Sequence, residues 1–238
     1  MLRVLLDSAE ARLGEHPRTA ARPDTPFADL AGYSMSGLPV LRKLTDLAKQ
    51  LQARGTRGEI VECGVCNGGS AAALYLGYRA MDPQVWLYDS FEGMPPPGPL
   101  DGPAASAYTG MCAGSEARVL EAMGIVGARR EDLVLRKGWF ERTFQEPLPE
   151  RIAILHIDAD WYEGVRLCLS TFYDRVVDGG VIILDDFGHW EGCREAFYDF
   201  AREKNVKPLI ERFGHTQAYW IKGHEHNRVQ ARGKEDAR

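Results

Sequence analysis

The sequence predicts an α/β protein with a doubly wound, mostly parallel sheet of seven strands and helices on both faces. Short β-branched segments alternate with helix-forming segments five times along the chain, which is typical of parallel strands joined by crossover helices. Two further apolar segments then follow with no helix between them, so we expect a final hairpin that adds one antiparallel strand. Polar and glycine-rich segments follow several of the strands, where such sheets bind ligands.

The first part of the chain, residues 1–55, is expected to form an N-terminal arm and a helical cap. Residues 1–30 are polar and hold three prolines, which predicts an irregular arm. Residues 38–54 carry apolar side chains at helical spacing, and Gly55 ends that helix. Residues 2–13 could pack on a partner subunit, so a homo-oligomer is a possibility.

The second part, residues 56–223, is expected to form the main α/β domain. Its segment 91–110 holds five prolines and four glycines, so we expect a mobile loop at 93–112 that covers a site. Residues 224–238 offer no apolar content to bury and predict a disordered tail. The expected strands are 59–64, 85–89, 132–138, 152–158, 181–186, 206–211 and 217–222, and the expected helices are 70–81, 115–124, 162–176 and 191–204.

The composition narrows the function class. A formal net charge of −5 offers no basic surface for nucleic acid or for an anionic membrane. No apolar run approaches the roughly 18 residues that span a bilayer, and the N-terminus does not predict a signal peptide. Five cysteines without disulfide or zinc spacing indicate reduced thiols, as in a cytoplasmic protein; Cys63 and Cys66 form a single CxxC, which we do not expect to bind zinc.

A glycine-rich turn follows the first predicted strand and begins a helix, in the segment ECGVCNGGS. It lacks the GxGxxG spacing, but its ExGxxxGG pattern resembles the first motif of class I methyltransferases, in which the turn wraps the amino-acid part of S-adenosylmethionine. The alternative is a tight turn that needs glycine for packing alone. The candidate cofactor residues in this turn are Glu62, Gly64, Gly68, Gly69 and Ser70.

An acidic residue ends the second predicted strand. Asp89 lies where an acid binds the ribose hydroxyls in nucleoside-binding sheets, whether of NAD or of S-adenosylmethionine, although it could instead cap a turn. Ser90 and Phe91 follow it and are candidate nucleoside contacts. Trp139, after the third strand, is a candidate contact on the adenine side or a buried structural tryptophan.

Four aspartates follow the fourth and fifth predicted strands. Asp158 and Asp160 are two residues apart and would point to one side of a strand, and Asp185 and Asp186 would arrive beside them from the next strand. Like charges about 4 Å apart cost on the order of 4 kcal/mol at an effective dielectric near 20, so a hard divalent cation such as Mg²⁺ is the natural compensation. The alternative is that each aspartate caps a turn.

Several ordered segments together resemble the macrocin O-methyltransferase family, which methylates sugar hydroxyls on antibiotics. They are VECGVCNGGS, YDSFEGMP, HIDADWYEGVRLCLSTFY, GGVIILDDFGHWEGCREAFYDF and QAYWIKG. The resemblance implies a Rossmann-like class I methyltransferase fold and S-adenosylmethionine as the donor. It also implies Asp158, Asp185 and Asp186 as magnesium ligands and Asp160 as the general base.

The acceptor is expected to be a small molecule, a glycoside if the resemblance extends to the substrate. His189 and Tyr162 are candidate substrate contacts, although His189 could equally cap a loop. Alternatives are a metal-dependent O-methyltransferase of a catechol or phenol, an NAD-dependent oxidoreductase and a non-catalytic binding protein. The Asp185–Asp186 pair counts against the catechol enzymes, whose second cluster resembles Asp-Asn, and the absence of GxGxxG counts against the oxidoreductase.

Overall fold

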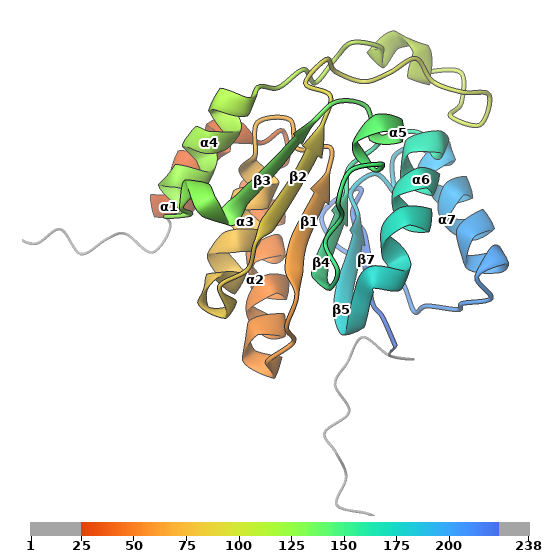
Figure 1. Ribbon diagram of the computed structural model, residues 1–238. Helices are drawn as coiled ribbons and strands as arrows, with labels where there is room; N and C mark the ends of the chain where they lie inside the picture. Colours follow the sequence, from red (N-terminus) through yellow and green to blue (C-terminus); the bar gives the residue numbers. More distant parts are fainter. Residues whose placement is uncertain (1–24, 224–238) are drawn as a thin grey trace, which may run out of the picture.

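The sheet has seven strands in the order β3-β2-β1-β4-β5-β7-β6 (Figure 1). In this computed structural model, which describes residues 25–223, β1, β2, β3, β4 and β5 are parallel, and β7 pairs antiparallel with both β5 and β6. The predicted fold class is therefore confirmed. The strands are β1 (Glu59–Cys63), β2 (Val85–Asp89), β3 (Leu133–Lys137), β4 (Ile152–Ile157), β5 (Val176–Leu184), β6 (Glu211–Arg212) and β7 (Ala218–Ile221).

Helices cover both faces of the sheet, with one apolar cluster under each layer (Figure 1). One face packs against α2, α3 and α4, and the other face packs against α6 and α7. The helices are α1 (Thr25–Leu30), α2 (Leu38–Arg54), α3 (Gly69–Tyr78), α4 (Glu116–Ile125), α5 (Phe140–Thr143), α6 (Tyr162–Phe172) and α7 (Glu191–Glu203).

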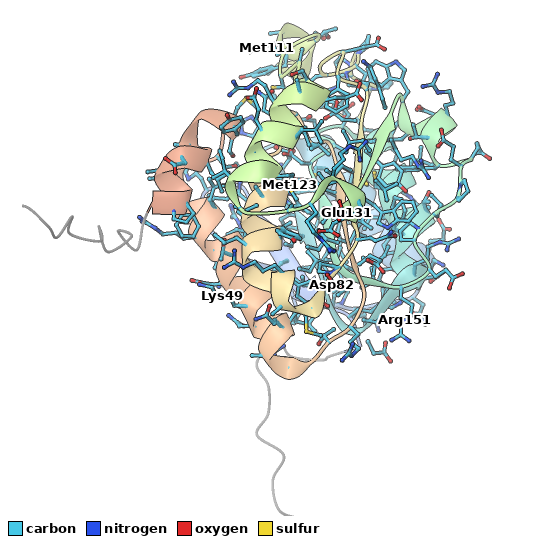
Figure 2. The ribbon with its side chains drawn as sticks, turned by 60° about the vertical axis from the view of Figure 1, so that its left-hand side comes forward. Lys49, Asp82, Met111, Met123, Glu131 and Arg151 are labelled. Atoms are coloured by element: carbon cyan, nitrogen blue, oxygen red, sulfur yellow. The ribbon has the colours of Figure 1, made fainter. Side chains whose placement is uncertain are left out.

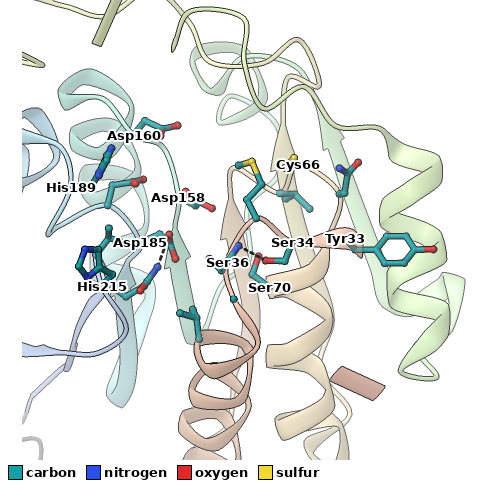
Figure 3. Close-up of a pocket in the computed structure, with 18 of the residues that line it drawn as sticks. Tyr33, Ser34, Ser36, Cys66, Ser70, Asp158, Asp160, Asp185, His189 and His215 are labelled. Atoms are coloured by element: carbon teal, nitrogen blue, oxygen red, sulfur yellow. Dashed lines mark hydrogen bonds between the residues drawn. The ribbon is translucent and has the colours of Figure 1, made fainter. Parts of the chain in front are cut away.

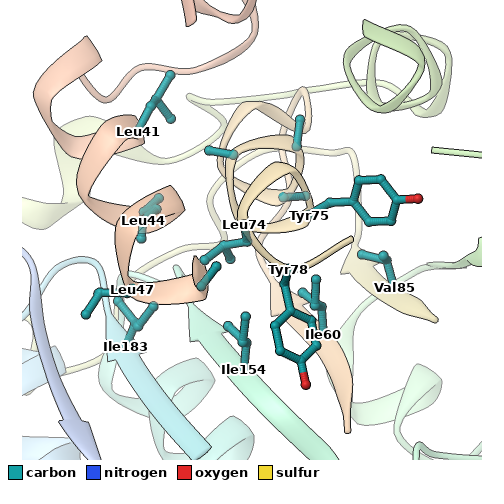
Figure 4. Packing of buried hydrophobic residues seen from close by; sticks show 14 of the residues in the cluster. Leu41, Leu44, Leu47, Ile60, Leu74, Tyr75, Tyr78, Val85, Ile154 and Ile183 are labelled. Atoms are coloured by element: carbon teal, nitrogen blue, oxygen red, sulfur yellow. The ribbon is translucent and has the colours of Figure 1, made fainter. Parts of the chain in front are cut away.

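The predicted helix at 38–54 forms as expected and buries its apolar face. Leu41, Leu44 and Leu47 follow one another at spacings of three residues and point toward α3 and the sheet (Figure 4). Each is at most 1% exposed, and burying such a side chain is worth about 1.5–3 kcal/mol. Thr45 lies in the same interface, where its hydroxyl donates to the Ala73 carbonyl oxygen at 2.8 Å.

The prediction of an irregular segment at 1–30 is wrong for residues 25–30, which form α1. Two apolar side chains explain the helix: Leu30 is fully buried and Phe27 packs on the same cluster. Pro26 is compatible with a first helical turn, where its missing N–H would have no helical partner. The predicted arm at residues 1–24 and the predicted tail at 224–238 lie outside the described residues.

Two predicted strands differ from the observed strands by more than one residue, whereas the other five agree within one residue at each end. β5 begins at Val176 rather than 181, because α6 ends at Phe172 and the Gly179–Gly180 pair lies within an irregular start of the strand. The strand expected at 206–211 is reduced to the two residues of β6. Pro208 explains this shortening, since proline has no N–H to donate to a neighbouring strand.

The proline-rich loop, residues 93–112, extends over the carboxyl ends of the strands near α5 and α6 (Figure 1). Its two ends are joined, since the Met94 N–H donates to the Met111 carbonyl and the Gly110 N–H donates to the Met94 carbonyl, both at 2.8 Å. It contains one short 3₁₀ helix, Ala105–Tyr108. Figure 2 shows Met111 at this end of the molecule and Lys49 at the other. The mobility of the loop stays a prediction.

Two further properties concern the environment of the protein. Within residues 25–223, none of the helices combines the length and apolar character that a membrane span requires. All five cysteines fall within this range and are free thiols.

Candidate active site

The carboxyl ends of β1, β2, β4 and β5 border two cavities. The first cavity, about 500 Å³, lies between the segment before α2, the glycine-rich turn after β1 and the turn before β7 (Figure 3). The second cavity, about 440 Å³, lies between the ends of β2 and β4 and the proline-rich loop. Asp158 and Asp160 line both cavities, so the two spaces meet at these carboxylates.

The glycine-rich turn packs directly against the end of β4. The Asp158 N–H donates to the Cys63 carbonyl at 2.8 Å, which continues the parallel pairing of β1 and β4 beyond the strands. Gly64 has a φ of 86°, and a Cβ atom there would collide with the Asp158 carbonyl oxygen. Glycine is therefore required at this position, because any side chain would push the first metal-candidate aspartate away from the turn.

Asp89 holds the same turn from the other side. Its Oδ2 accepts hydrogen bonds from the Val65 and Cys66 N–H groups, and its Oδ1 accepts one from the Phe91 N–H, at 2.6–2.7 Å. Asp89 therefore does cap the turn, as the alternative interpretation expected. Asp89 also lines the second cavity, and carboxylate oxygens accept more than one hydrogen bond each, so capacity for a ribose hydroxyl remains.

The remaining predicted donor-side residues divide into two groups. Gly64, Ser90 and Trp139 line the second cavity; Trp139 is 39% exposed, so the alternative of a buried structural tryptophan is wrong. Ser70 lines the first cavity instead. The residues that line neither cavity are Glu62, Gly68, Gly69 and Phe91, and Phe91 is partly buried against the apolar cluster on the α2, α3 and α4 face of the sheet.

Three of the four predicted aspartates converge. Asp158, Asp160 and Asp186 each offer an oxygen atom, and these atoms all lie within 4.8 Å of one another. The strand-alternation argument for the first pair is wrong, because β4 ends at Ile157 and Asp160 adopts a left-handed φ of 53°. A tight turn after the strand, rather than the pleat of the strand, brings the two side chains together.

Asp185 is not one of these three oxygen donors, although it lines the same cavity, and it belongs to a buried chain of polar side chains. Its Oδ2 accepts from the Gln217 amide at 3.0 Å (Figure 3), and its Oδ1 lies 3.4 Å from His156 Nε2. His156 Nδ1 lies 2.8 Å from Glu62 Oε1, which also accepts a hydrogen bond from the Ser70 hydroxyl. The chain therefore connects the glycine-rich turn to the aspartates after β5.

The ionisation of these groups reflects burial and mutual repulsion. Burial, with added repulsion from the neighbouring carboxylates, raises the pKa of Asp158 and of Asp186 well above the usual range. Burial also raises the pKa of Asp160 to about 7, against a hydrogen bond from the Trp190 indole N–H at 3.3 Å. Burial opposes protonation of His156, but the Asp185 and Glu62 carboxylates outweigh it and raise its pKa to about 10.

A divalent cation fits this arrangement. Asp186 Oδ2 is buried and has no hydrogen-bond partner among the described residues, and no lysine or arginine lines the first cavity to neutralise the carboxylates. Three hard oxygen donors at short range are the ligand type of Mg²⁺ or Ca²⁺. Asp185 adds a fourth carboxylate whose orientation is fixed by Gln217 and His156.

The two predicted substrate contacts have different positions. His189 is exposed, lines the first cavity and packs edge-on against Trp190, with ring centroids 4.3 Å apart. Tyr162 lines neither cavity, because it begins α6 on the side that faces α7 and its hydroxyl donates to Asp199 at 3.1 Å. The structure therefore does not support a direct substrate contact by Tyr162.

Several residues of the cavities did not emerge from the sequence. Ser34 and Ser36, from the segment before α2, lie across the first cavity from the aspartates (Figure 3), and Met35 from the same segment also lines it. His215 and Gln217, from the turn before β7, close its other side. Gln217 begins the segment QAYWIKG, which carries part of the family resemblance, but the neighbourhoods of the other four residues carry no recognisable motif. A buried Gln217 beside an apolar strand is the one feature that could have suggested a polar partner inside the protein.

Comparison with known proteins places the chain in one family. Residues 5–222 match the family described as Macrocin-O-methyltransferase (TylF). An 8-demethyl-8-(2,3-dimethoxy-alpha-L-rhamnosyl)-tetracenomycin-C 4'-O-methyltransferase of Streptomyces olivaceus is 28% identical over 214 residues, which cover 86% of this chain and 80% of that protein. A mycinamicin III 3''-O-methyltransferase of Micromonospora griseorubida is 27% identical over 199 residues, 79% of this chain and 78% of that protein.

A solved structure agrees with this result. The O-methyltransferase NovP superposes with a TM-score of 0.70 at 25% identity, covering 79% of this chain and 81% of that one. The match to the family extends from before α1 to the end of β7, so it includes the glycine-rich turn, the proline-rich loop and all four aspartates. The chain therefore belongs to the macrocin-O-methyltransferase family and is an O-methyltransferase.

Proposed function

We propose that this enzyme transfers a methyl group from S-adenosylmethionine to a sugar hydroxyl of a glycosylated natural product, with the help of a divalent cation. The observation that carries the proposal is the junction of the two cavities at Asp158 and Asp160. Methyl transfer needs a donor and an acceptor that approach one another from opposite sides of the methyl group. Two cavities that meet at a cluster of carboxylates provide that arrangement.

The second cavity suits the donor. Asp89 offers carboxylate oxygens for the ribose hydroxyls, and the half-exposed Trp139 offers a ring face for the adenine. Gly64 and Cys66 bring the backbone of the glycine-rich turn to the same cavity, where the amino-acid part of the donor would lie. S-adenosylmethionine supplies the sulfonium methyl group that is transferred.

The first cavity suits a polyol. Its walls carry hydroxyl, amide and imidazole groups, and Tyr33 is the single Phe, Tyr or Trp among its lining residues. A catechol would instead favour flat apolar walls. This polar lining supports a sugar acceptor over a phenol, in agreement with the names of the relatives in Streptomyces and Micromonospora.

We assign Asp158, Asp185 and Asp186 as the residues that would hold the cation, as the family resemblance implies. A bound divalent cation would orient the acceptor oxygen and make its hydroxyl more acidic. Asp160 lies within 4.8 Å of two of these carboxylates and is the proposed general base. Its pKa of about 7 suits a group that accepts a proton near neutral pH, and the Trp190 indole N–H holds its carboxylate in place.

The direct experiment measures S-adenosylhomocysteine formation with deoxysugar glycosides and, in parallel, with catechols. We expect turnover with a glycoside in the presence of Mg²⁺ and loss of turnover with a chelator. The Asp160→Asn variant should retain donor binding and lose turnover by about 100-fold or more, the scale of general-base catalysis. Turnover of catechols alone would support the rival function, and near-normal turnover by Asp160→Asn would overturn the base assignment.

A matched control is Asp46→Asn. Asp46 lies on α2, its side chain is 62% exposed, and it pairs with Lys49 rather than with the site. This variant should keep both turnover and metal dependence.

The free cysteines and the negative net charge support a cytoplasmic enzyme that acts on a small molecule.

A further inference from the structure

A buried carboxylate lies inside the proline-rich loop, most of whose residues are exposed or partly exposed. Asp101 is 2% exposed although it sits in a segment rich in proline and glycine. Its Oδ1 accepts a hydrogen bond from the Tyr162 N–H and its Oδ2 accepts one from the Gly98 N–H, both at 2.7 Å. One carboxylate therefore joins the loop to the first residue of α6 and fixes the turn of the loop around itself.

The surroundings of Asp101 are shaped to receive it. Gly192, in the first turn of α7, leaves the space that the carboxylate occupies, because a Cβ atom there would collide with Asp101 Oδ1. The carboxylate thus lies between the N-terminal ends of α6 and α7, which run side by side under the loop (Figure 1). The partial positive charge at both helix ends favours an anion at this point.

Other contacts of the loop lead to the proposed base. The Trp161 indole N–H donates to the Pro95 carbonyl at 2.7 Å, and the Tyr108 ring packs edge-on against Trp190 with centroids 4.9 Å apart. Trp190 also donates to Asp160, and Trp161 directly follows Asp160. The loop therefore contacts both Trp161, which follows Asp160 in the chain, and Trp190, which donates a hydrogen bond to Asp160.

The loop contributes to only one of the two cavities. Seven of its residues line the donor cavity, and none lines the first cavity. A change in the position of the loop should therefore alter the donor site before it alters the acceptor site. These seven residues are Gly93, Met94, Pro95, Pro96, Gly98, Asp101 and Cys112.

We propose that Asp101 is a positioning residue of the methyl-transfer site: by binding the Tyr162 N–H between α6 and α7, it holds the proline-rich loop as a wall of the donor cavity. Nothing in this role requires Asp101 to touch the reacting atoms. The inference rests on the proposed function in assigning the second cavity to S-adenosylmethionine. The placement of Asp101 itself is independent of that assignment.

The test combines hydrogen exchange with donor binding. In Asp101→Ala, we expect amide exchange within residues 93–112 to accelerate by at least about tenfold, because the hydrogen bonds of one charged group are lost. Exchange in β4 and β5 should stay unchanged. The dissociation constant of S-adenosylhomocysteine, measured by calorimetry, should rise by at least about tenfold. Asp101→Asn should be intermediate, since its amide oxygen can still accept one N–H.

Gly192 provides the matched variant. Gly192→Ala should displace the Asp101 carboxylate and reproduce the effects of Asp101→Ala, whereas adding Gly192→Ala to Asp101→Ala should have little further effect. If each substitution only destabilised the fold in general, the effects of the two substitutions would instead add in the double variant. Asp46→Ala, far from the loop, should change neither exchange in the loop nor donor binding.

The outcomes separate this inference from the proposed function. If S-adenosylhomocysteine does not bind the wild-type protein, the donor assignment fails, while the exchange measurement still tests the contact of Asp101. If the compound binds wild type and Asp101→Ala equally, or if loop exchange is unchanged in Asp101→Ala, the positioning role is wrong. Additive effects of the two substitutions would also overturn it.

Discussion

The cluster of Asp158, Asp160 and Asp186 predicts that removing one of its charges makes the metal-free protein more stable than the wild type. Their oxygen atoms lie within 4.8 Å of one another, and at an effective dielectric of 20 each ionised pair at that distance costs about 3.5 kcal/mol. Asp186→Asn removes two such pairs. Protonation of the aspartates already relieves part of this repulsion, so we expect a net gain of about 2 kcal/mol in the metal-free protein.

The measurement is the melting temperature at mildly alkaline pH, with chelator and with saturating Mg²⁺. A gain of about 2 kcal/mol corresponds to about 4–8 °C for a domain of this size, so metal-free Asp186→Asn should melt above metal-free wild type. Adding Mg²⁺ should stabilise wild type by about 2.7 kcal/mol at a hundredfold excess over the dissociation constant, and should leave the variant nearly unchanged.

The side-chain environment makes this test specific. Asp186 Oδ2 accepts no hydrogen bond within residues 25–223, so the asparagine loses no partner at that atom. Asp46→Asn is the control and should respond to Mg²⁺ as wild type does. A lower melting temperature of Asp186→Asn in chelator, or a wild type that does not respond to Mg²⁺, would refute the repulsion argument.

Three further predictions concern pH, the buried polar chain and the donor. The pKa of Asp160 is raised to about 7 in the folded state, so the metal-free protein should lose up to about 4 kcal/mol of stability as pH rises from about 4 to 7. Denaturant titrations across that range should show a falling midpoint concentration of denaturant. A rising midpoint concentration would contradict the raised pKa. His156→Asn should cost about 3–5 kcal/mol, because Glu62 and Asp185 lose a buried partner; unfolding in urea tests this, and a near-neutral effect would show that the chain is dispensable. Trp139→Ala should weaken S-adenosylhomocysteine binding by about tenfold if its ring stacks on adenine, and calorimetry would reveal no change if it does not.

The sheet and the meeting of the aspartates could be predicted from the sequence. Parallel strands end at one edge of a sheet, so Asp158, directly after β4, and Asp186, two residues after the end of the neighbouring β5, are expected close together. Regular spacing of apolar residues likewise predicted a helix at 38–54, and α2 has these bounds. Both inferences use periodicity and topology, which a single sequence carries.

The details of the site could not be predicted, because they depend on contacts between distant segments. The left-handed turn at Asp160 replaced the expected strand geometry, and nothing local to the sequence requires it. The partners of Asp185, Gln217 and His156, come from β7 and β4, and the burial of Asp101 depends on a space left by Gly192 in another helix. Such pairings appear only when the elements are packed.

The central claim is that the aspartates after β4 and β5 bind a divalent cation, and calorimetric titration of Mg²⁺ into chelator-treated protein tests it most directly. We expect one binding site per chain in the wild type, and loss of that site in Asp158→Asn, with Asp46→Asn binding as the wild type does. Absence of Mg²⁺ binding to the wild type, or unchanged binding by Asp158→Asn, would contradict the account.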